Sequence, residues 1–245
     1  MVFKGNVFRL ACAAFAALSL AAFLPASAAA ASPLPSGAVG SDISWPQCGD
    51  PMPSAGSFAV LGVNGGAPFS GNLCMMDQYA NAPRSAPPSL YLNTGYLPEY
   101  RYLVTSGCRY QAHSITGMDI EREAWAIGCS EAETSIKYAY ALGASSISMW
   151  WLDVEIMNKW SLQLNLNRFT LQGAVTRLSE TDLPVGIYSS PAMWVMITGV
   201  LALPGYLSAI WFAGGSCSRP FLPNVEVPVW LVQHTFNHLD HDWAC

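Results

Sequence analysis

Hydrophobic residues occur along this chain as short blocks, separated by stretches in which apolar positions recur at helical spacing. The blocks are rich in β-branched and aromatic residues and predict β-strands. They span residues 41–45, 58–63, 89–93, 146–156, 184–189, 209–213 and 227–235. The helical spacing predicts helices over residues 121–142, 164–181 and 193–200. Because strands that alternate with helices form parallel sheets, and so many strands in one domain favour closure, we predict an irregular TIM-like (β/α) barrel of the α/β class.

One long stretch interrupts this alternation. Residues Tyr96 to Met118 show neither strand nor helix periodicity, and they include Cys108. We interpret this stretch as a loop insertion that a disulfide holds in place.

The N-terminus has the pattern of a secretory signal. Lys4 and Arg9 precede the apolar stretch Leu10–Leu24, and Ala26-Ser27-Ala28 offers a small-residue cleavage site. A membrane-spanning helix needs roughly 20 apolar residues, so stable membrane insertion is not expected, with a membrane-anchored form as the alternative. We predict a signal peptide over residues 1–28, a disordered lead-in over 29–40 and one barrel domain over 41–245. The protein is then secreted, either extracellular or in the cell wall.

Cysteine usage agrees with an oxidising compartment. Of the seven cysteines, Cys12 leaves with the signal peptide. An even number remains, which predicts a disulfide framework. Many connectivities are possible, but the order along the chain suggests three local pairs. These are Cys48–Cys74, Cys108–Cys129 and Cys217–Cys245.

Charge excludes several classes of partner. The formal net charge is −5 and no Lys/Arg cluster occurs, which disfavours nucleic acids and acidic membrane surfaces. Asn64-Gly65-Gly66 has neither a following Lys nor the spacing of a dinucleotide-binding loop, so no cofactor is implied. Nine tryptophans and ten tyrosines provide aromatic faces on which sugar rings stack, although most large aromatics in a chain are core residues. A monomer is expected.

The sharpest chemical feature is a pair of acids in an apolar strand. Asp153 and Glu155 are two positions apart, so both point to the same side of the sheet. Burying two like charges raises one pKa, which gives a protonated general acid beside an ionised partner, as glycosidic bond cleavage requires. The alternative is a structural pair satisfied by backbone amides or by an arginine at the strand end.

Further acids lie near both ends of the predicted barrel. Asp42 is on the first strand, and Asp240 and Asp242 follow the last one. In a barrel the first and last strands are neighbours, and active sites lie at the carboxyl ends of the strands. We therefore expect these acids near Asp153 and Glu155, with one terminal aspartate as a possible cap instead.

Three histidines lie among the terminal acids. His234, His238 and His241 do not have a standard metal-ligand spacing. Solvated histidines are the favoured interpretation, and no metal is predicted.

Several motifs occur in an order that resembles glycoside hydrolase family 25, the lysozyme-type muramidases. They are Asp42-Ile43-Ser44, Asp153-Val154-Glu155, Gly186-Ile187-Tyr188-Ser189, Trp211-Phe212-Ala213, Trp230-Leu231-Val232-Gln233-His234 and a terminal Asp. In more detail, the segments 41–48 and 151–155 resemble a group of secreted actinobacterial-type glycoside-hydrolase-like proteins.

The resemblance implies an irregular α/β barrel that cleaves the β-1,4 bond between N-acetylmuramic acid and N-acetylglucosamine in peptidoglycan. Glu155 would be the general acid, and Asp153 would orient the substrate acetamido group as it attacks the anomeric carbon. Asp42 and a terminal aspartate, Asp240 or Asp242, would hold the sugar and tune the acid. The residues implied to line the cleft are Tyr188, Trp211 and Gln233, and we expect Trp151 and Asn93 to bind substrate beside them.

The chain departs from the family pattern in its extra cysteines and in the insertion over residues 96–118. It also offers no wall-binding repeat. Two alternatives to an enzyme follow: a barrel that binds cell-wall glycan without cleaving it, and a structural protein of the envelope in which the acids are incidental.

Overall fold

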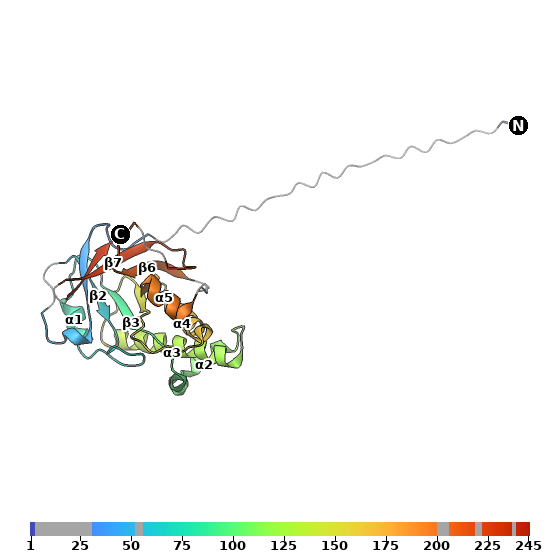
Figure 1. The fold of residues 1–245 in the computed structure, drawn as a ribbon, viewed down its shortest axis with the longest axis horizontal. Coiled ribbons are helices and arrows are strands. Elements are labelled where there is room, and N and C mark those ends of the chain that lie inside the picture. The colour runs from blue at the N-terminus through green and yellow to red at the C-terminus, as the bar shows by residue number, and fades with distance from the viewer. Residues whose placement is uncertain (3–30, 52–55, 200–205, 219–221, 237–238) are drawn as a thin grey trace.

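The structure is a computed structural model that describes the chain apart from residues 3–30, 52–55, 200–205, 219–221 and 237–238 (Figure 1). The predicted signal peptide therefore lies almost entirely outside the described residues. None of the helices in the described ranges is long and apolar enough to cross a membrane.

Eight strands of the described chain form a closed barrel in sequence order (Figure 1). They are β1 (Val39–Ile43), β2 (Phe58–Gly62), β3 (Ser89–Asn93), β4 (Trp150–Asp153), β5 (Val185–Ser189), β6 (Leu207–Ala213), β7 (Val229–Phe236) and β8 (Leu239–Ala244). Neighbours from β1 to β7 pair in parallel. The α/β barrel predicted from the sequence is confirmed.

Strand β8 was not predicted. It pairs antiparallel with both β7 and β1 and so closes the barrel. Its polar residues, Asp240, His241 and Asp242, resemble a solvated chain end. They instead alternate between the two faces of a strand, as a hairpin to β7 allows.

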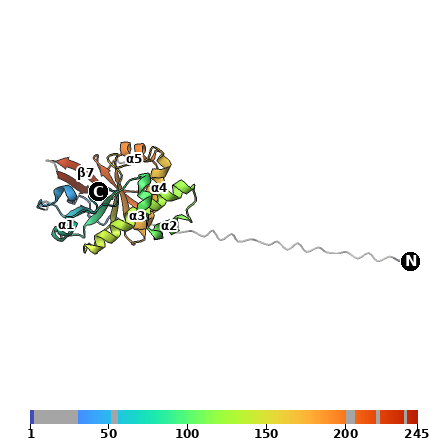
Figure 2. The ribbon, with the colours of Figure 1, turned by 90° about the horizontal axis from the view of Figure 1, so that it is seen from below.

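The helices lie outside the barrel, and Figure 2 shows α3, α4 and α5 along one side of it. The helical segments are η1 (Trp45–Gln47), α1 (Met75–Asn81), η2 (Pro98–Leu103), α2 (Ser106–Ala112), α3 (Asp119–Ala141), α4 (Leu164–Ser179) and α5 (Pro191–Thr198). Of these, α3, α4 and α5 match the three predicted helices. Gly143, predicted to end the first of them, has a φ of 88°, as the residue after a helix commonly does.

Helices α3 and α4 pack with their backbones in close contact. A Cβ atom added at Gly128 would lie 1.8 Å from the Thr170 carbonyl oxygen, and one added at Gly173 would lie 2.0 Å from that of Trp125. Only glycine fits at this crossing, because a Cβ would overlap the backbone of the other helix.

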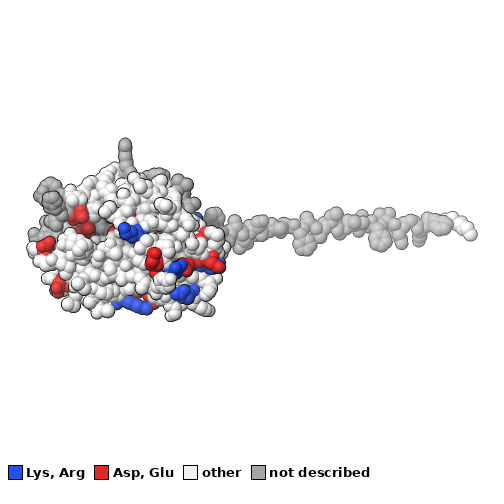
Figure 3. All heavy atoms as spheres, turned by 60° about the horizontal axis from the view of Figure 1, so that its bottom comes forward, with Lys and Arg blue, Asp and Glu red and all other residues white. Residues whose placement is uncertain are grey.

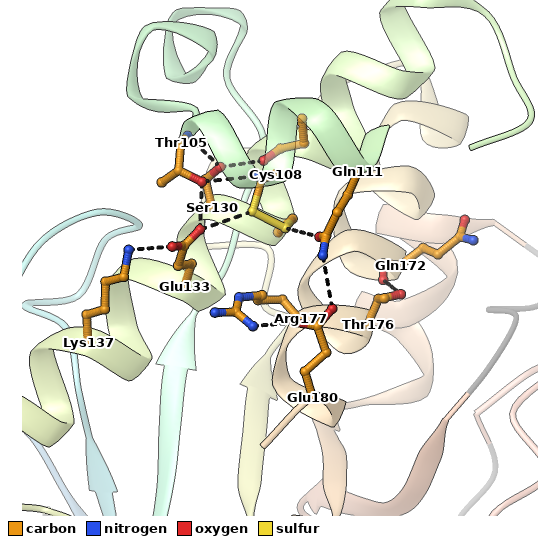
Figure 4. Close-up of a disulfide and its surroundings, with 12 residues drawn as sticks. Thr105, Cys108, Gln111, Ser130, Glu133, Lys137, Gln172, Thr176, Arg177 and Glu180 are labelled. Atoms are coloured by element: carbon orange, nitrogen blue, oxygen red, sulfur yellow. Dashed lines mark hydrogen bonds and ion pairs between the residues drawn. A yellow bond between two sulfur atoms is a disulfide. The ribbon is translucent and has the colours of Figure 1, made fainter. Parts of the chain in front are cut away.

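The insertion over residues 96–118 is more ordered than expected. It contains η2 and α2, which are too short to show a helical period in the sequence. Helix α2 is joined to α3 by the Cys108–Cys129 disulfide (Figure 4). Thr105, which caps α2, also donates to the Glu133 carboxylate of α3 at 2.6 Å.

The three local disulfide pairs suggested by the order of the cysteines are confirmed. The lead-in, expected to be disordered up to residue 40, is wrong at its C-terminal end. Leu34 is buried, the Gly37 amide donates to the Ala244 carbonyl at 2.8 Å, and β1 begins at Val39. Small residues suggested a linker, but they allow the chain to pack against β8.

Charged residues are sparse on the surface. On the face shown in Figure 3, Lys and Arg are interspersed with Asp and Glu and form no continuous basic patch.

Candidate active site

A cavity of about 240 Å³ opens at the carboxyl ends of the parallel strands. Four carboxyl side chains line it, from Asp42, Asp153, Glu155 and Asp240. Alternation within each strand explains why they converge, since every second residue faces the barrel interior. Asp153 and Glu155, two positions apart, therefore both reach this cavity, whereas Val154 between them packs in the outer core.

Asp153 is the more buried of the two acids, with only 5% of its surface exposed. Its Oδ2 accepts a hydrogen bond from the Asn93 amide, and its Oδ1 is buried without a partner among the described residues. Burial, followed by the negative charges of Glu155 and Asp42, raises the pKa of Asp153 well above its ordinary value.

Asn93 is itself held rigidly. The Asn64 side chain donates to the Asn93 carbonyl at 2.9 Å and accepts from the Asn93 amide at 3.1 Å. Both backbone groups at the end of β3 are thereby satisfied, which leaves the Asn93 side chain fixed on Asp153. Asn93, which we expected to contact substrate, lines the cavity and holds the Asp153 carboxyl group in place.

Glu155 follows the end of β4 and is only partly buried. Its carbonyl accepts from the Trp160 indole at 2.7 Å and from the Asn158 amide at 3.1 Å, which fixes the turn that carries it. Burial raises the pKa of Glu155 and Asp240 adds to the shift, while the Tyr188 hydroxyl acts against it. Glu155 is thus an acid near the cavity opening that retains its proton at higher pH than a free glutamate.

A chain of hydrogen bonds crosses the cavity wall from β5 to β1. The Tyr188 hydroxyl donates to Gln233 Oε1 at 2.6 Å, and Gln233 Nε2 donates to Asp42 Oδ2 at 2.8 Å. Burial and the charge of Asp240 raise the pKa of Asp42 to about 7. The three side chains come from separate strands, yet each is fixed by its neighbour.

The structure separates the two terminal aspartates. Asp240 lines the cavity and accepts from Thr235 Oγ1 at 2.6 Å. Asp242 is fully buried beneath it and accepts from the Trp211 indole at 2.8 Å. Burial, and then the charge of Asp42, raise the pKa of Asp242 well above its ordinary value.

Aromatic rings form the base of the cavity. Tyr188 and Trp211 line it, with ring centroids 4.5 Å apart. Trp151, expected to contact substrate, is instead fully buried one layer deeper, 5.8 Å from Trp211. Its position two residues before Asp153 faces the interior but lies below the opening, so Trp151 supports Trp211. Gly186 makes room for it, because a Cβ there would lie 2.1 Å from the Trp151 ring.

Two aromatic residues of the cavity were missed in the sequence. Tyr91 lies two positions before Asn93 on β3, so the alternation that selects Asn93 also predicts Tyr91. Trp45 lies in η1, immediately after β1, and is 49% exposed. An apolar residue followed by proline, in a loop directly after Asp42, is the signal that could have identified it.

Of the three histidines near the C-terminus, the two that the structure describes, His234 and His241, do not line the cavity. His234 is exposed and its ring contacts Trp243, with centroids 5.2 Å apart. His241 lies on β8, and His238 falls outside the described residues. Within the described part of the chain, no group of three His, Cys, Asp or Glu side chains has the arrangement of a metal site.

Comparisons with known proteins show which fold the chain shares. A sequence profile described as lysozyme-like protein 1 matches residues 130–218. No curated protein sequence matches significantly. Among solved structures, the muramidase from Acremonium alcalophilum superposes with a TM-score of 0.55 at 15% identity, over 85% of this chain and 93% of that one.

Two further solved structures, one bacterial and one from a bacteriophage, have the same fold. A lysozyme from Streptomyces coelicolor gives a TM-score of 0.51 at 16% identity, over 85% of this chain and 92% of that one. The catalytic domain of endolysin ply40, from bacteriophage P40 of Listeria monocytogenes, gives 0.51 at 14% identity, over 85% and 93%. The resemblance to lysozyme-type barrels is confirmed in the fold.

Proposed function

Because the chain has the barrel of the lysozyme-like muramidases, we propose that it is a secreted glycosidase that hydrolyses the glycan strands of peptidoglycan. The bond cleaved is the β-1,4 bond between N-acetylmuramic acid and N-acetylglucosamine. The single observation that carries this proposal is that Asp153, at the end of β4, and Glu155, in the turn after it, line one cavity with different degrees of burial.

Glu155 is the proposed general acid. It lies nearer to solvent than Asp153, and its raised pKa keeps the proton available for the glycosidic oxygen. The proton moves from the Glu155 carboxyl to that oxygen as the bond to the anomeric carbon breaks. Asp240 supports this role, because its charge disfavours ionised Glu155.

Asp153 is proposed to orient the substrate acetamido group. Asn93 fixes its Oδ2 and so sets the orientation of the carboxyl group in the cavity lining. The acetamido oxygen then attacks the anomeric carbon, and the positive charge that develops on the acetamido group favours the ionised form of Asp153. Water then attacks the anomeric carbon of the cyclic intermediate formed in this way, and the Glu155 carboxylate takes up the proton that the water loses.

The remaining polar groups are proposed to hold the sugar. Asp42 and Asp240 flank the cavity opposite Asp153, and the Tyr188–Gln233–Asp42 chain keeps their wall rigid. Fixed polar groups lower the cost of organising the transition state, because they need not reorient during the reaction.

The test is the release of reducing ends from purified cell walls by wild type and Glu155→Gln. We expect Glu155→Gln to lower the rate at least a hundredfold while binding to the walls is kept. Equal rates for both proteins would remove Glu155 from the mechanism. Wild type that binds walls but releases no reducing ends would support a non-catalytic glycan-binding barrel, and a protein that does neither would support a structural role.

A further inference from the structure

Trp45 is an exposed aromatic side chain on the rim of an acidic cavity. It lines the cavity from η1, three residues after Asp42, and 49% of its surface is exposed. A single exposed hydrophobic residue needs no functional explanation. What distinguishes Trp45 is how firmly its surroundings hold it.

The backbone on both sides of Trp45 is fixed. The Ser44 amide donates to Gln47 Oε1 at 2.9 Å, and Gln78 Nε2 of α1 donates to the Ser44 carbonyl at 2.7 Å. Cys48 is then joined by a disulfide to Cys74, which precedes α1. The short segment that carries Trp45 is therefore tied twice to the same helix.

The indole ring is fixed by a second loop. Gly66, which also lines the cavity, has a φ of 78°, and a Cβ built on it would lie 2.6 Å from Trp45 Nε1. A larger residue at this position would displace the ring. The edge of the indole thus rests on the backbone of Gly66, while the exposed part of the ring lies on the cavity rim.

Charge limits what the ring could bind. Among the described residues that line the cavity, four are carboxylic acids and none is Lys, Arg or His. A carboxylate or sulfate on the ligand would meet acidic side chains and no cationic partner among the described lining residues. An uncharged pyranose presents C–H groups that pack on an indole face and hydroxyl groups that hydrogen-bond to the surrounding acids.

We propose that Trp45 is a prebuilt platform for an uncharged sugar ring of the N-acetylhexosamine class, held in place by the Cys48–Cys74 disulfide and Gly66. The inference rests on the proposed function, because it takes the cavity to be a glycan site. Beyond the proposed function, the inference states where one sugar ring binds and that this ring is uncharged. Because the ring is ordered before the ligand arrives, less entropy is lost on binding.

The first test measures calorimetric binding of the N-acetylglucosamine tetramer to Glu155→Gln, with and without Trp45→Ala. We expect Trp45→Ala to weaken binding about tenfold or more, and Trp45→Phe to recover part of the loss. Tyr110→Ala, which removes an exposed aromatic residue of α2, is the matched control and should leave binding unchanged. Equal affinity with and without Trp45, or no binding by Glu155→Gln, would overturn the platform.

A second probe tests the charge preference. A tetramer of galacturonic acid has a comparable length and carries a carboxylate on each ring. We expect it to bind Glu155→Gln at least tenfold more weakly than the neutral tetramer at low salt. Binding of equal or greater strength would contradict the uncharged site.

The role of the Cys48–Cys74 disulfide in holding Trp45 is tested by Cys48→Ser together with Cys74→Ser. This change should weaken binding of the neutral tetramer severalfold, but should add little once Trp45→Ala is present. Full additivity would mean that the disulfide does not act through Trp45. Reducing-end release is measured separately: tetramer binding that depends on Trp45, without any release from cell walls by wild type, would contradict the proposed hydrolysis and leave the platform in place.

Discussion

The Asn93 side chain at the end of β3 donates a hydrogen bond to Oδ2 of Asp153 at the end of β4. The two residues are register partners in neighbouring parallel strands. The sheet therefore presents one carboxylate oxygen already paired and the other, Oδ1, without a partner among the described residues. The contact with Asn93 therefore fixes the orientation of the Asp153 carboxyl group in the cavity lining.

Asn93→Ala should lower kcat about tenfold to a hundredfold with a smaller change in KM, because Asp153 loses its fixed orientation. Loss of the donor should also raise the pKa of Asp153, so that the acid limb of the kcat profile moves to higher pH. Steady-state kinetics between pH 4 and 8 measure both effects. An unchanged acid limb would mean that Asn93 has only a structural role.

Glu131 predicts how stability depends on pH. It is fully buried in α3 outside the cavity, its Oε2 accepts from Thr94 Oγ1 at 2.6 Å, and burial raises its pKa well above the ordinary value. A folded-state pKa above that of the unfolded chain stabilises the fold below about pH 4.5, and this contribution is lost as pH rises through the folded-state pKa. Wild type should therefore become less stable as the solution approaches neutrality.

The Glu131→Gln variant reproduces the protonated form at every pH. Its thermal midpoint should match that of wild type near pH 4 and exceed it by a few degrees near pH 7. Asp153 and Asp242 are also buried with raised pKa values, so some pH dependence should remain. If the thermal midpoints of the two proteins changed with pH in the same way from pH 4 to 7, Glu131 would not be buried in its uncharged form.

Gly128→Ala should destabilise the protein by about 2 kcal/mol or more, because its Cβ would overlap the Thr170 carbonyl of α4. Gly107→Ala in α2 is the matched control, since a Cβ there meets no atom within 4 Å. The control should be neutral or slightly stabilising, as alanine is the better helix former. Urea unfolding compares the two, and similar midpoints would contradict the close helix crossing.

Cys108→Ser with Cys129→Ser should lower stability by about 3 kcal/mol, because the bridge closes a loop with a sequence separation of 21 residues. Local hydrogen bonds remain, including those between α2 and α3 shown in Figure 4. Limited proteolysis should then cut first within residues 98–112. If residues 98–112 were cut no faster in the variant than in wild type, the insertion would not depend on its disulfide.

Much of the barrel could be predicted because several parallel strands, among them β2, β4 and β5, are buried on both faces and read as apolar blocks. The same pattern identified Asp153 and Glu155 as candidates, because burying two acids in such an apolar block costs free energy unless the acids are paired or protonated. The predicted strand over residues 146–156 was too long, however. Hydrophobicity continues past the hydrogen-bonded strand Trp150–Asp153 into buried loop residues such as Met149 and Val154.

The parts that could not be predicted depend on contacts between distant segments. Asp240 and Asp242 look equivalent in sequence, yet one lines the cavity and the other lies beneath it, because β8 is a strand closing the barrel. Trp151 follows the alternation rule but lies below the opening. Periodicity predicts which side of a strand a residue faces, but not how deep in the barrel it lies. Trp45 acquires its place from Gly66 and Cys74, more than 20 residues away.

The strand that completes the barrel is also the last to be synthesised. Strand β8 lies between β1 and β7 and brings in Asp240, while Cys245 is fixed to Cys217. Strand β1 therefore cannot pair with β8 until about 200 further residues have been synthesised. Because Asp240 lines the cavity from β8, the cavity lining is incomplete until this strand has paired with β1 and β7.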